Sequence, residues 1–185
     1  LWFTWWLVRL AFGSPGAMGD FFRLRRSKKG LDALSKGMVA VGAGDVAGAQ
    51  RQAVAARKLM ADSPLAHLLE AQAAQMRGDE DKVKYNYTQM LDDPESEVVA
   101  LRGLYTLARK SGDEAAARRH AERALRLNPA LAWAAEAMMT YQSGDEDWPA
   151  ALELIENQRK SGGLDREHSN AMKAVVLTAQ AQAAE

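Results

Sequence analysis

Apolar residues recur at intervals of three and four along most of the chain, in segments of helical length separated by short polar turns. Four of these turns contain the dipeptide Gly-Asp, at Gly44-Asp45, Gly78-Asp79, Gly112-Asp113 and Gly144-Asp145. The first three dipeptides are evenly spaced, and the fourth comes slightly early. Their interval matches the length of a tetratricopeptide repeat, about 34 residues, which consists of two antiparallel helices and their turns. We expect the glycines to adopt the left-handed conformation that ends a helix, and the aspartates to cap the helix that follows.

This pattern predicts four helix pairs and one final helix. The expected pairs are 31–43 with 46–60, 65–77 with 80–91, 97–111 with 114–127, and 132–143 with 147–160, before a helix near 165–184. Each pair leaves an apolar face that only a neighbouring pair can cover, so the pairs stack into a solenoid. The predicted fold of residues 31–185 is therefore all-α, a tetratricopeptide-repeat α-solenoid. A plain helix bundle is the alternative, but it explains the regular spacing of the turns poorly.

Small residues agree with this register. They stand at the same two positions after the turn glycine in the first and third units, at Ala49, Ala56, Ala117 and Ala124. In the fourth unit, Trp148, Ala151 and Ile155 restore the spacing after the early dipeptide. We expect these positions to lie where the second helix of a pair crosses its neighbours closely.

The chain opens with an apolar segment, residues 1–12, that contains Trp2, Trp5 and Trp6. Tryptophan concentrates at the interface between a membrane and water. This segment is too short to cross a bilayer, which takes about 20 residues in a helix, so we expect it to be the C-terminal end of a transmembrane helix. The alternatives are a buried N-terminal helix of a soluble protein and the remnant of a signal peptide. Basic residues follow the apolar run rather than precede it, which argues against a signal peptide.

Residues 13–30 form an expected basic segment beside the membrane. Its cations are Arg23, Arg25, Arg26, Lys28 and Lys29. Such clusters favour the anionic cytoplasmic leaflet by about 1 kcal/mol per cation, and the positive-inside rule then places the repeats in the cytoplasm. Because the whole chain has a net charge of zero, the repeats themselves are acidic, which argues against binding to nucleic acid.

Few residues point to catalysis. The chain has no cysteine, which excludes disulfides, thiolate metal sites, iron–sulfur ligation and haem attachment through C-x-x-C-H. His67, His120 and His168 fall in different predicted helices, and none has a partner at i+4 for a metal pair. We predict no catalytic residue, no metal and no cofactor. Because one side chain suffices for axial ligation of haem, His67, His120, Met38 and Met76 stay open as alternatives.

Partner binding has more support. In this repeat class the first helix of each pair lines the concave surface. The positions predicted to face partners are Arg102, Thr106, Arg109 and Lys110 in the third repeat, Gln72, Gln75 and Met76 in the second, and Trp133, Glu136 and Thr140 in the fourth. Arginine binds carboxylates through two parallel hydrogen bonds, so this surface suits an extended segment with acidic groups. The alternative is a solvated helix face.

The equivalent positions of the first repeat are apolar. They are Leu31, Leu34, Met38 and Val41. A contiguous apolar patch seldom faces water, so we expect it to meet a partner or the chain's own juxtamembrane helix.

Several segments resemble the HemY-type membrane proteins of proteobacteria. They are Trp6-Leu7-Val8-Arg9-Leu10, Phe12-Gly13-Ser14-Pro15-Gly16, the basic run from Arg23 to Lys29, Gly30-Leu31-Asp32-Ala33-Leu34-Ser35-Lys36-Gly37-Met38-Val39-Ala40, and Leu101-Arg102-Gly103-Leu104-Tyr105. The resemblance covers nearly the whole chain. It implies N-terminal transmembrane helices before a tetratricopeptide domain, in the bacterial inner membrane, and an association with late haem (tetrapyrrole) biosynthesis. The chain has no G-x-G-x-x-G fingerprint for a flavin or another dinucleotide.

The expected function is a membrane-anchored scaffold, not an enzyme. The expected partners are proteins, namely enzymes of tetrapyrrole synthesis, together with anionic lipid. The alternative is an accessory or assembly subunit of a larger respiratory or photosynthetic membrane complex that has no role in haem synthesis.

The repeat register makes a prediction about stability. Replacing Ala117 or Ala124 with leucine should overfill the helix crossings and lower the free energy of unfolding by about 1–3 kcal/mol. Thermal unfolding followed by circular dichroism measures the effect. Unchanged melting temperatures for both variants would show that these positions are not close crossings.

Overall fold

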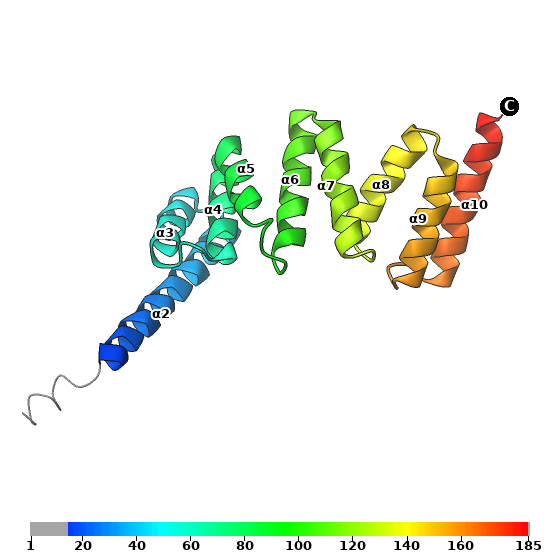
Figure 1. Cartoon of the computed structure of the whole chain (residues 1–185). Helices are drawn as coiled ribbons and strands as arrows, with labels where there is room; N and C mark the ends of the chain where they lie inside the picture. The colour runs from blue at the N-terminus through cyan, green and yellow to red at the C-terminus, as the bar shows by residue number, and fades with distance from the viewer. Residues whose placement is uncertain (1–14, 185) are drawn as a thin grey trace, which may run out of the picture. The chain divides into compact units, whose positions relative to one another are not determined.

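The computed structural model describes residues 15–184, which form nine α-helices and no strand (Figure 1). The helices are α2 (Pro15–Gly42), α3 (Val46–Leu59), α4 (Pro64–Met76), α5 (Glu80–Gln89), α6 (Glu97–Ser111), α7 (Glu114–Leu127), α8 (Ala132–Gly144), α9 (Trp148–Lys160) and α10 (Arg166–Ala183). This confirms the all-α prediction for this part of the chain. From α3 onward, the helices begin and end close to the predicted positions. The predicted transmembrane end, residues 1–12, lies outside the described residues.

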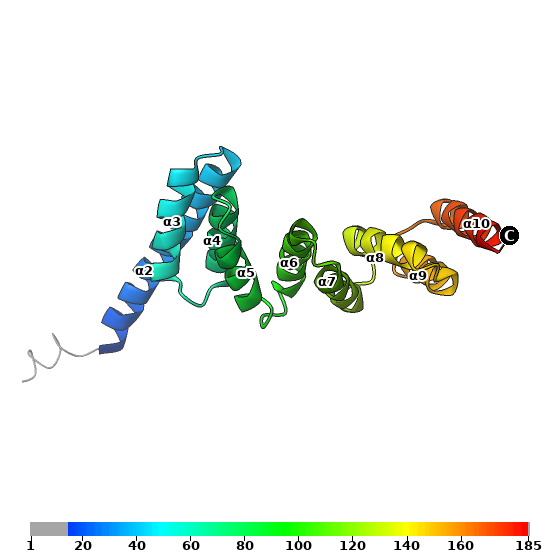
Figure 2. The same ribbon diagram turned by 90° about the horizontal axis from the view of Figure 1, so that it is seen from above.

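The chain forms two compact units with a boundary between Asn86 and Tyr87, inside α5. In the first unit, α2 packs on α3 and α4. In the second unit, each helix from α6 to α10 packs against the next along the chain. Figure 2 shows α6, α8 and α10 on one side of this second unit and α7 and α9 on the other. The first helices of successive pairs therefore share a face, which we call the first-helix face.

The turns inside the helix pairs have the predicted backbone geometry. Gly44, Gly78 and Gly112 have φ values of 73°, 72° and 76°, in the left-handed region that favours glycine. The aspartate after each glycine accepts a hydrogen bond from the backbone N–H of a residue in the next helix, as in the 2.8 Å bond from Gly48 to Asp45. These contacts satisfy backbone donors that the first turn of a helix leaves without partners.

The fourth turn keeps the repeat period although its dipeptide does not. Glu146, which stands one full period after Gly112, is the residue with a positive φ here, at 56°. Asp147 then caps α9 by accepting a hydrogen bond of 3.2 Å from the N–H of Ala150. Gly144 remains within α8 and Asp145 is the C-cap of that helix; the carboxylate of Asp145 receives the guanidinium of Arg118 and does not cap α9. The repeat geometry therefore depends on the position of the residue with positive φ, and this residue need not be the glycine of a Gly-Asp dipeptide.

The first helix is longer than predicted. It begins at Pro15 rather than near residue 31, so the basic segment 13–30 is helical from Pro15 onward and continuous with the first repeat. Proline suits the first turn of a helix because the N–H it lacks would have no partner there. Farther along, Gly37 lets α2 approach α4 closely, because a Cβ at this position would lie 2.3 Å from Cδ2 of Leu69. None of the helices within residues 15–184 is long and apolar enough to cross a membrane.

Small residues fill the helix crossings as the register predicted. Those with no exposed surface include Ala49, Ala56, Ala117, Ala124 and Ala151, and the larger Ile155 is also fully buried. In the first unit, the alanines of α3 join Leu34 and Leu69 in one core cluster. In the second, Ala121 and Ala124 of α7 face residues of α8 such as Ala134 and Met138. Alanine at these positions lets the helices approach closely, so larger side chains would have to displace a neighbour.

The fourth turn makes a testable prediction. A residue other than glycine is strained in the left-handed region by about 1–2 kcal/mol, so Glu146→Gly should stabilise the fold by about 0.5–1 kcal/mol. Gly112→Ala places the same strain in the preceding repeat and should destabilise the protein by a similar amount. Urea unfolding followed by circular dichroism compares the two. A loss of stability in Glu146→Gly would show that this turn is not under left-handed strain.

Candidate functional site

A pocket of about 360 Å³ lies between α6 and α8 on the first-helix face. It is lined by Arg102, Tyr105, Thr106, Arg109, Trp133, Glu136, Ala137 and Thr140. Most of the partner-binding positions predicted in the third and fourth repeats therefore meet in one pocket. They meet because each is on a first helix and successive first helices are neighbours on this face.

The two arginines of this pocket differ in their surroundings. Arg109 donates a hydrogen bond of 3.0 Å to Glu114, and Tyr141 donates one of 2.8 Å to the same carboxylate oxygen. Hydrogen bonding with Tyr141, and next the charge of Glu114, raises the pKa of Arg109 above its ordinary value. Arg102 is exposed and forms no ion pair with any residue that the structure describes. Of the two arginines that line this pocket, Arg102 is therefore the one without an ion pair to a described residue.

Aromatic and hydroxyl groups complete the pocket. The rings of Tyr105 and Trp133 are 5.3 Å apart and tilted by 45°, which joins α6 to α8. The hydroxyl groups of Thr106 and Thr140 donate to the backbone of their own helices, so they present lone pairs to the pocket. The pocket combines one available cation, an aromatic wall and several acceptors. These groups suit a ligand that carries a carboxylate together with N–H donors.

A second pocket of about 260 Å³ lies farther along the same face, between α8 and α10. Its lining is mostly apolar and includes Met139, Ile155, Leu164 and Met172. Lys173 of α10 donates a hydrogen bond of 2.6 Å to Glu156 of α9, which holds α10 in place. Hydrogen bonds from Arg159 and then Lys173 lower the pKa of Glu156 from 4.5 to about 2, so this carboxylate stays charged in acid below the pH at which a free glutamate is protonated.

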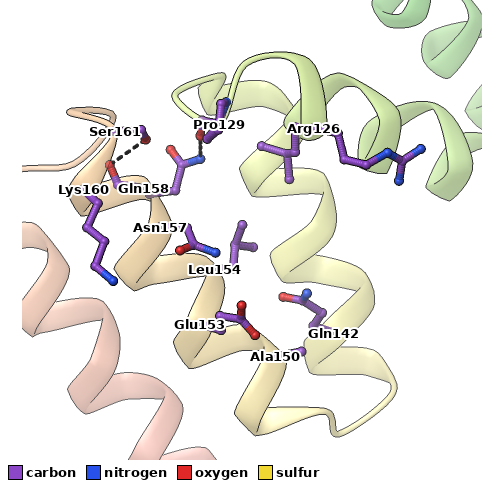
Figure 3. A pocket seen from close by; sticks show the side chains of 11 residues that line it. Arg126, Pro129, Gln142, Ala150, Glu153, Leu154, Asn157, Gln158, Lys160 and Ser161 are labelled. Atoms are coloured by element: carbon purple, nitrogen blue, oxygen red, sulfur yellow. Dashed lines mark hydrogen bonds between the residues drawn. The ribbon is translucent and has the colours of Figure 1, made fainter.

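A third pocket of about 660 Å³ involves α7, α8 and α9 (Figure 3). Arg126, Glu153 and Lys160 supply charges of both signs, and Gln158 donates a hydrogen bond to the backbone oxygen of Pro129. The side-chain oxygen of Gln142 is buried here and has no hydrogen-bond partner within the described part of the chain. None of the predicted partner-binding residues lines this pocket.

The remaining predicted partner-binding residues lie elsewhere. Gln72 and Gln75 are on α4 in the first unit, where the side-chain oxygen of Gln72 is buried and accepts no hydrogen bond from any described residue. Lys110 is exposed near the end of α6 and does not line the α6–α8 pocket. The predicted partner-binding positions that the structure brings into one pocket therefore belong to the third and fourth repeats.

The predicted apolar contact surface is divided. Leu34 is 6% exposed and lies in the core of the first unit, and Val41 packs against that core. Leu31 and Met38 are 53% and 46% exposed. Within the described residues, the chain covers half of the set and leaves Leu31 and Met38 exposed.

The predicted membrane-facing cations also differ from one another. Trp2, Trp5, Trp6 and the side chain of Arg23 lie outside the described part of the chain. Arg26 donates two hydrogen bonds of 3.0 Å, from Nε to the oxygen of Leu59 and from Nη2 to that of Lys58. These oxygens belong to the last turn of α3, where helix carbonyls lack intrahelical partners. Arg25, Lys28 and Lys29 are exposed, so three of these cations remain available for lipid.

His67 is buried and both of its ring nitrogens lie within hydrogen-bond distance of neighbouring side chains. It is 7% exposed, and its Nδ1 lies 2.9 Å from the side-chain oxygen of Asn86 while its Nε2 lies 3.1 Å from Arg57. Arginine can only donate, so Nε2 accepts and Nδ1 carries the proton that bonds Asn86. Arg57 also pairs with Glu70 at 3.0 Å. His67 therefore joins Arg57 of α3 to Asn86 of α5 within the first unit.

Residues 1–78 match the family model of the HemY protein N-terminus. The match supports the resemblance of this part of the chain to HemY-type proteins, and it ends at Gly78, within the first unit. No curated protein matches the chain.

Sequence reasoning missed several residues of these pockets. Tyr105, Met139 and Met172 were not predicted as pocket residues. Met139 follows Ala135 by one helical turn beside Glu136 and Thr140, a spacing that places it at the edge of the first-helix face. This spacing is the feature of the sequence that could have identified Met139 as a pocket residue.

The contact of Arg26 makes a prediction with a matched control. Arg26→Gln should lower the free energy of unfolding by about 1 kcal/mol, because the last carbonyls of α3 lose a charged donor. Arg25→Gln removes the same charge from an exposed neighbour and should change stability by less than about 0.5 kcal/mol. Thermal unfolding of the two variants in the same detergent compares them. Equal effects would show that Arg26 does not stabilise the contact between α2 and α3.

Proposed function

We propose that this protein is a membrane-anchored tetratricopeptide scaffold of the HemY type, without enzymatic activity of its own. It binds partner proteins through the first-helix face. The partners are enzymes of late haem (tetrapyrrole) synthesis, which it organises at the bacterial inner membrane with its repeats in the cytoplasm.

Two observations support the class of protein. The match of residues 1–78 to the HemY protein N-terminus supports a membrane protein associated with haem biosynthesis. The recurrence of the left-handed turn at Gly44, Gly78, Gly112 and Glu146 supports tetratricopeptide repeats, because it reproduces their period.

The observation that carries the binding role is the α6–α8 pocket. Repeat proteins build extended binding surfaces from equivalent positions of successive repeats, and this pocket draws Arg102 from one repeat and Trp133 and Glu136 from the next. Arginine and tryptophan are enriched among the residues that dominate protein interfaces. An arginine without an ion pair to a described residue, beside an aromatic wall, therefore favours a protein segment that carries a carboxylate.

The test is copurification of the full-length protein in mild detergent, followed by mass spectrometry. Enzymes of tetrapyrrole synthesis should be captured by the unmodified protein and lost, by about tenfold or more, in Arg102→Glu, because the substitution places two carboxylates together. Capture should also weaken as the salt concentration rises. The matched control is Arg119→Glu, which makes the same charge change at an exposed position of α7.

The outcomes separate the alternatives. Capture that survives Arg102→Glu would move the binding surface away from the first-helix face. Stoichiometric respiratory or photosynthetic subunits in place of tetrapyrrole enzymes would favour an accessory subunit of such a complex.

A further inference from the structure

The two pockets of the first-helix face share a border. Glu136 and Thr140 of α8 line both the α6–α8 pocket and the α8–α10 pocket. One helix therefore separates a site with an available cation from a site with apolar walls. A ligand that occupies both must cross α8 at these two residues.

The α8–α10 pocket has the dimensions and lining of a receptor for one large apolar side chain. Its volume of about 260 Å³ is below the roughly 300 Å³ at which pockets for small molecules begin. Ile155 is fully buried at its base, while Met139, Leu164 and Met172 are half-buried around it. Methionine side chains adapt to differently shaped apolar groups. The pocket therefore selects for apolar character and size more than for one residue type.

We propose that the first-helix face recognises an extended protein segment in which an acidic side chain at position i is paired with a large apolar side chain at i+3 or i−3. The acidic side chain pairs with Arg102, and the apolar side chain, such as leucine, methionine or phenylalanine, enters the α8–α10 pocket. This inference rests on the proposed function, because it specifies the segment that such a scaffold binds.

The spacing follows from helix packing. Neighbouring helices lie about 8–10 Å apart, so grooves on the two sides of α8 are separated by about the same distance. A chain in the polyproline II conformation rises about 3.1 Å per residue and completes a turn in about three residues, so side chains at i and i+3 face the same way about 9 Å apart. This conformation also leaves its backbone N–H groups free for acceptors.

Glu136 and Thr140, where the bound segment crosses α8, restrict which residues can stand between its acidic and apolar side chains. Glu136 is exposed on α8, and Thr140 presents a lone pair because its hydroxyl donates to the backbone oxygen of Glu136 at 3.0 Å. Both therefore accept hydrogen bonds from the N–H groups of the bound segment. Glu136 repels a second carboxylate, so the positions between the acidic and the apolar residue are not acidic.

A selection experiment tests the motif without knowledge of the natural partner. The full-length protein, immobilised in detergent micelles, is used to select from a displayed library of short random peptides. Enriched peptides should carry an acidic and a large apolar residue at the i, i+3 spacing. Synthetic peptides with the acidic residue changed to its amide, or with the apolar residue changed to serine, should bind at least about tenfold more weakly.

Variants of the protein assign each half of the motif. Met139→Gln should remove the preference for the apolar residue and keep the preference for the acidic residue. Arg102→Gln should remove the preference for the acidic residue and keep the preference for the apolar residue. Met172→Gln changes the opposite wall of the pocket and serves if Met139→Gln does not fold. Arg119→Gln, on α7, is the control for a general change in charge.

The results distinguish this inference from the proposed function. Peptides that depend on Arg102 but show no apolar residue at this spacing, with binding unchanged in Met139→Gln, would overturn the motif and leave the scaffold role intact. Peptides that depend on neither Arg102 nor Met139 would overturn both. Binding of phosphatidylserine vesicles that Met139→Gln abolishes, with no peptide selected, would assign the pocket to lipid and overturn the motif.

Discussion

A left-handed backbone turn that recurs once in every repeat determines the geometry on which the rest of this molecule depends. Each such turn reverses the chain between two helices, and the aspartate that follows caps the second helix by accepting a hydrogen bond from its first turn. Because the interval is constant, the first helices of successive pairs emerge in equivalent positions. Glu146 shows how strongly this constraint acts, since a residue with a Cβ adopts the left-handed conformation where the sequence lacks a glycine. The shared face of α6, α8 and α10 in the second unit is a consequence of this regularity.

Because the backbone is regular, side chains at the helix crossings and side chains on the first-helix face have different roles. Residues that face the neighbouring pairs are small and similar from repeat to repeat, because alanine at the crossings sets how closely the helices approach. Residues on the first-helix face are not under this restriction, so they can differ. Arg102 on α6, Glu136 on α8 and Met172 on α10 occupy one face but have unlike chemistry. A repeat architecture can in this way present a graded surface, from cationic to apolar, on helices of nearly identical packing.

Much of this arrangement was predictable because its signals are local. Gly-Asp marks three of the four turns, and Glu146-Asp147 keeps the same interval at the fourth, so the helices from α3 to α10 and the clustering of Arg102 with Trp133 followed from the period. Features that depend on tertiary contacts did not follow. Residues 13–30 were predicted as a basic segment separate from the first helix, although Pro15 suits the first turn of a helix that α3 and α4 then stabilise. Nothing local to Arg26 indicates that its partners are carbonyls at the end of another helix. The apolar pocket needs several helices, and no single segment specifies it.

The continuous α2 has a mechanical consequence for a membrane scaffold. Residues 15–30 rise about 1.5 Å each, so they form roughly 22 Å of helix before the core residues of the first unit begin. Arg26 bonds the end of α3, and Gly37 permits close contact with Leu69 on α4, so α2 is fixed to both helices. Within the described part of the chain, no flexible linker therefore separates the basic segment from the first repeats. A surface that binds the exposed Arg25, Lys28 and Lys29 thereby also orients α3 and α4. Under the proposed function, restricting orientation in this way would raise the effective concentration of one bound partner relative to another.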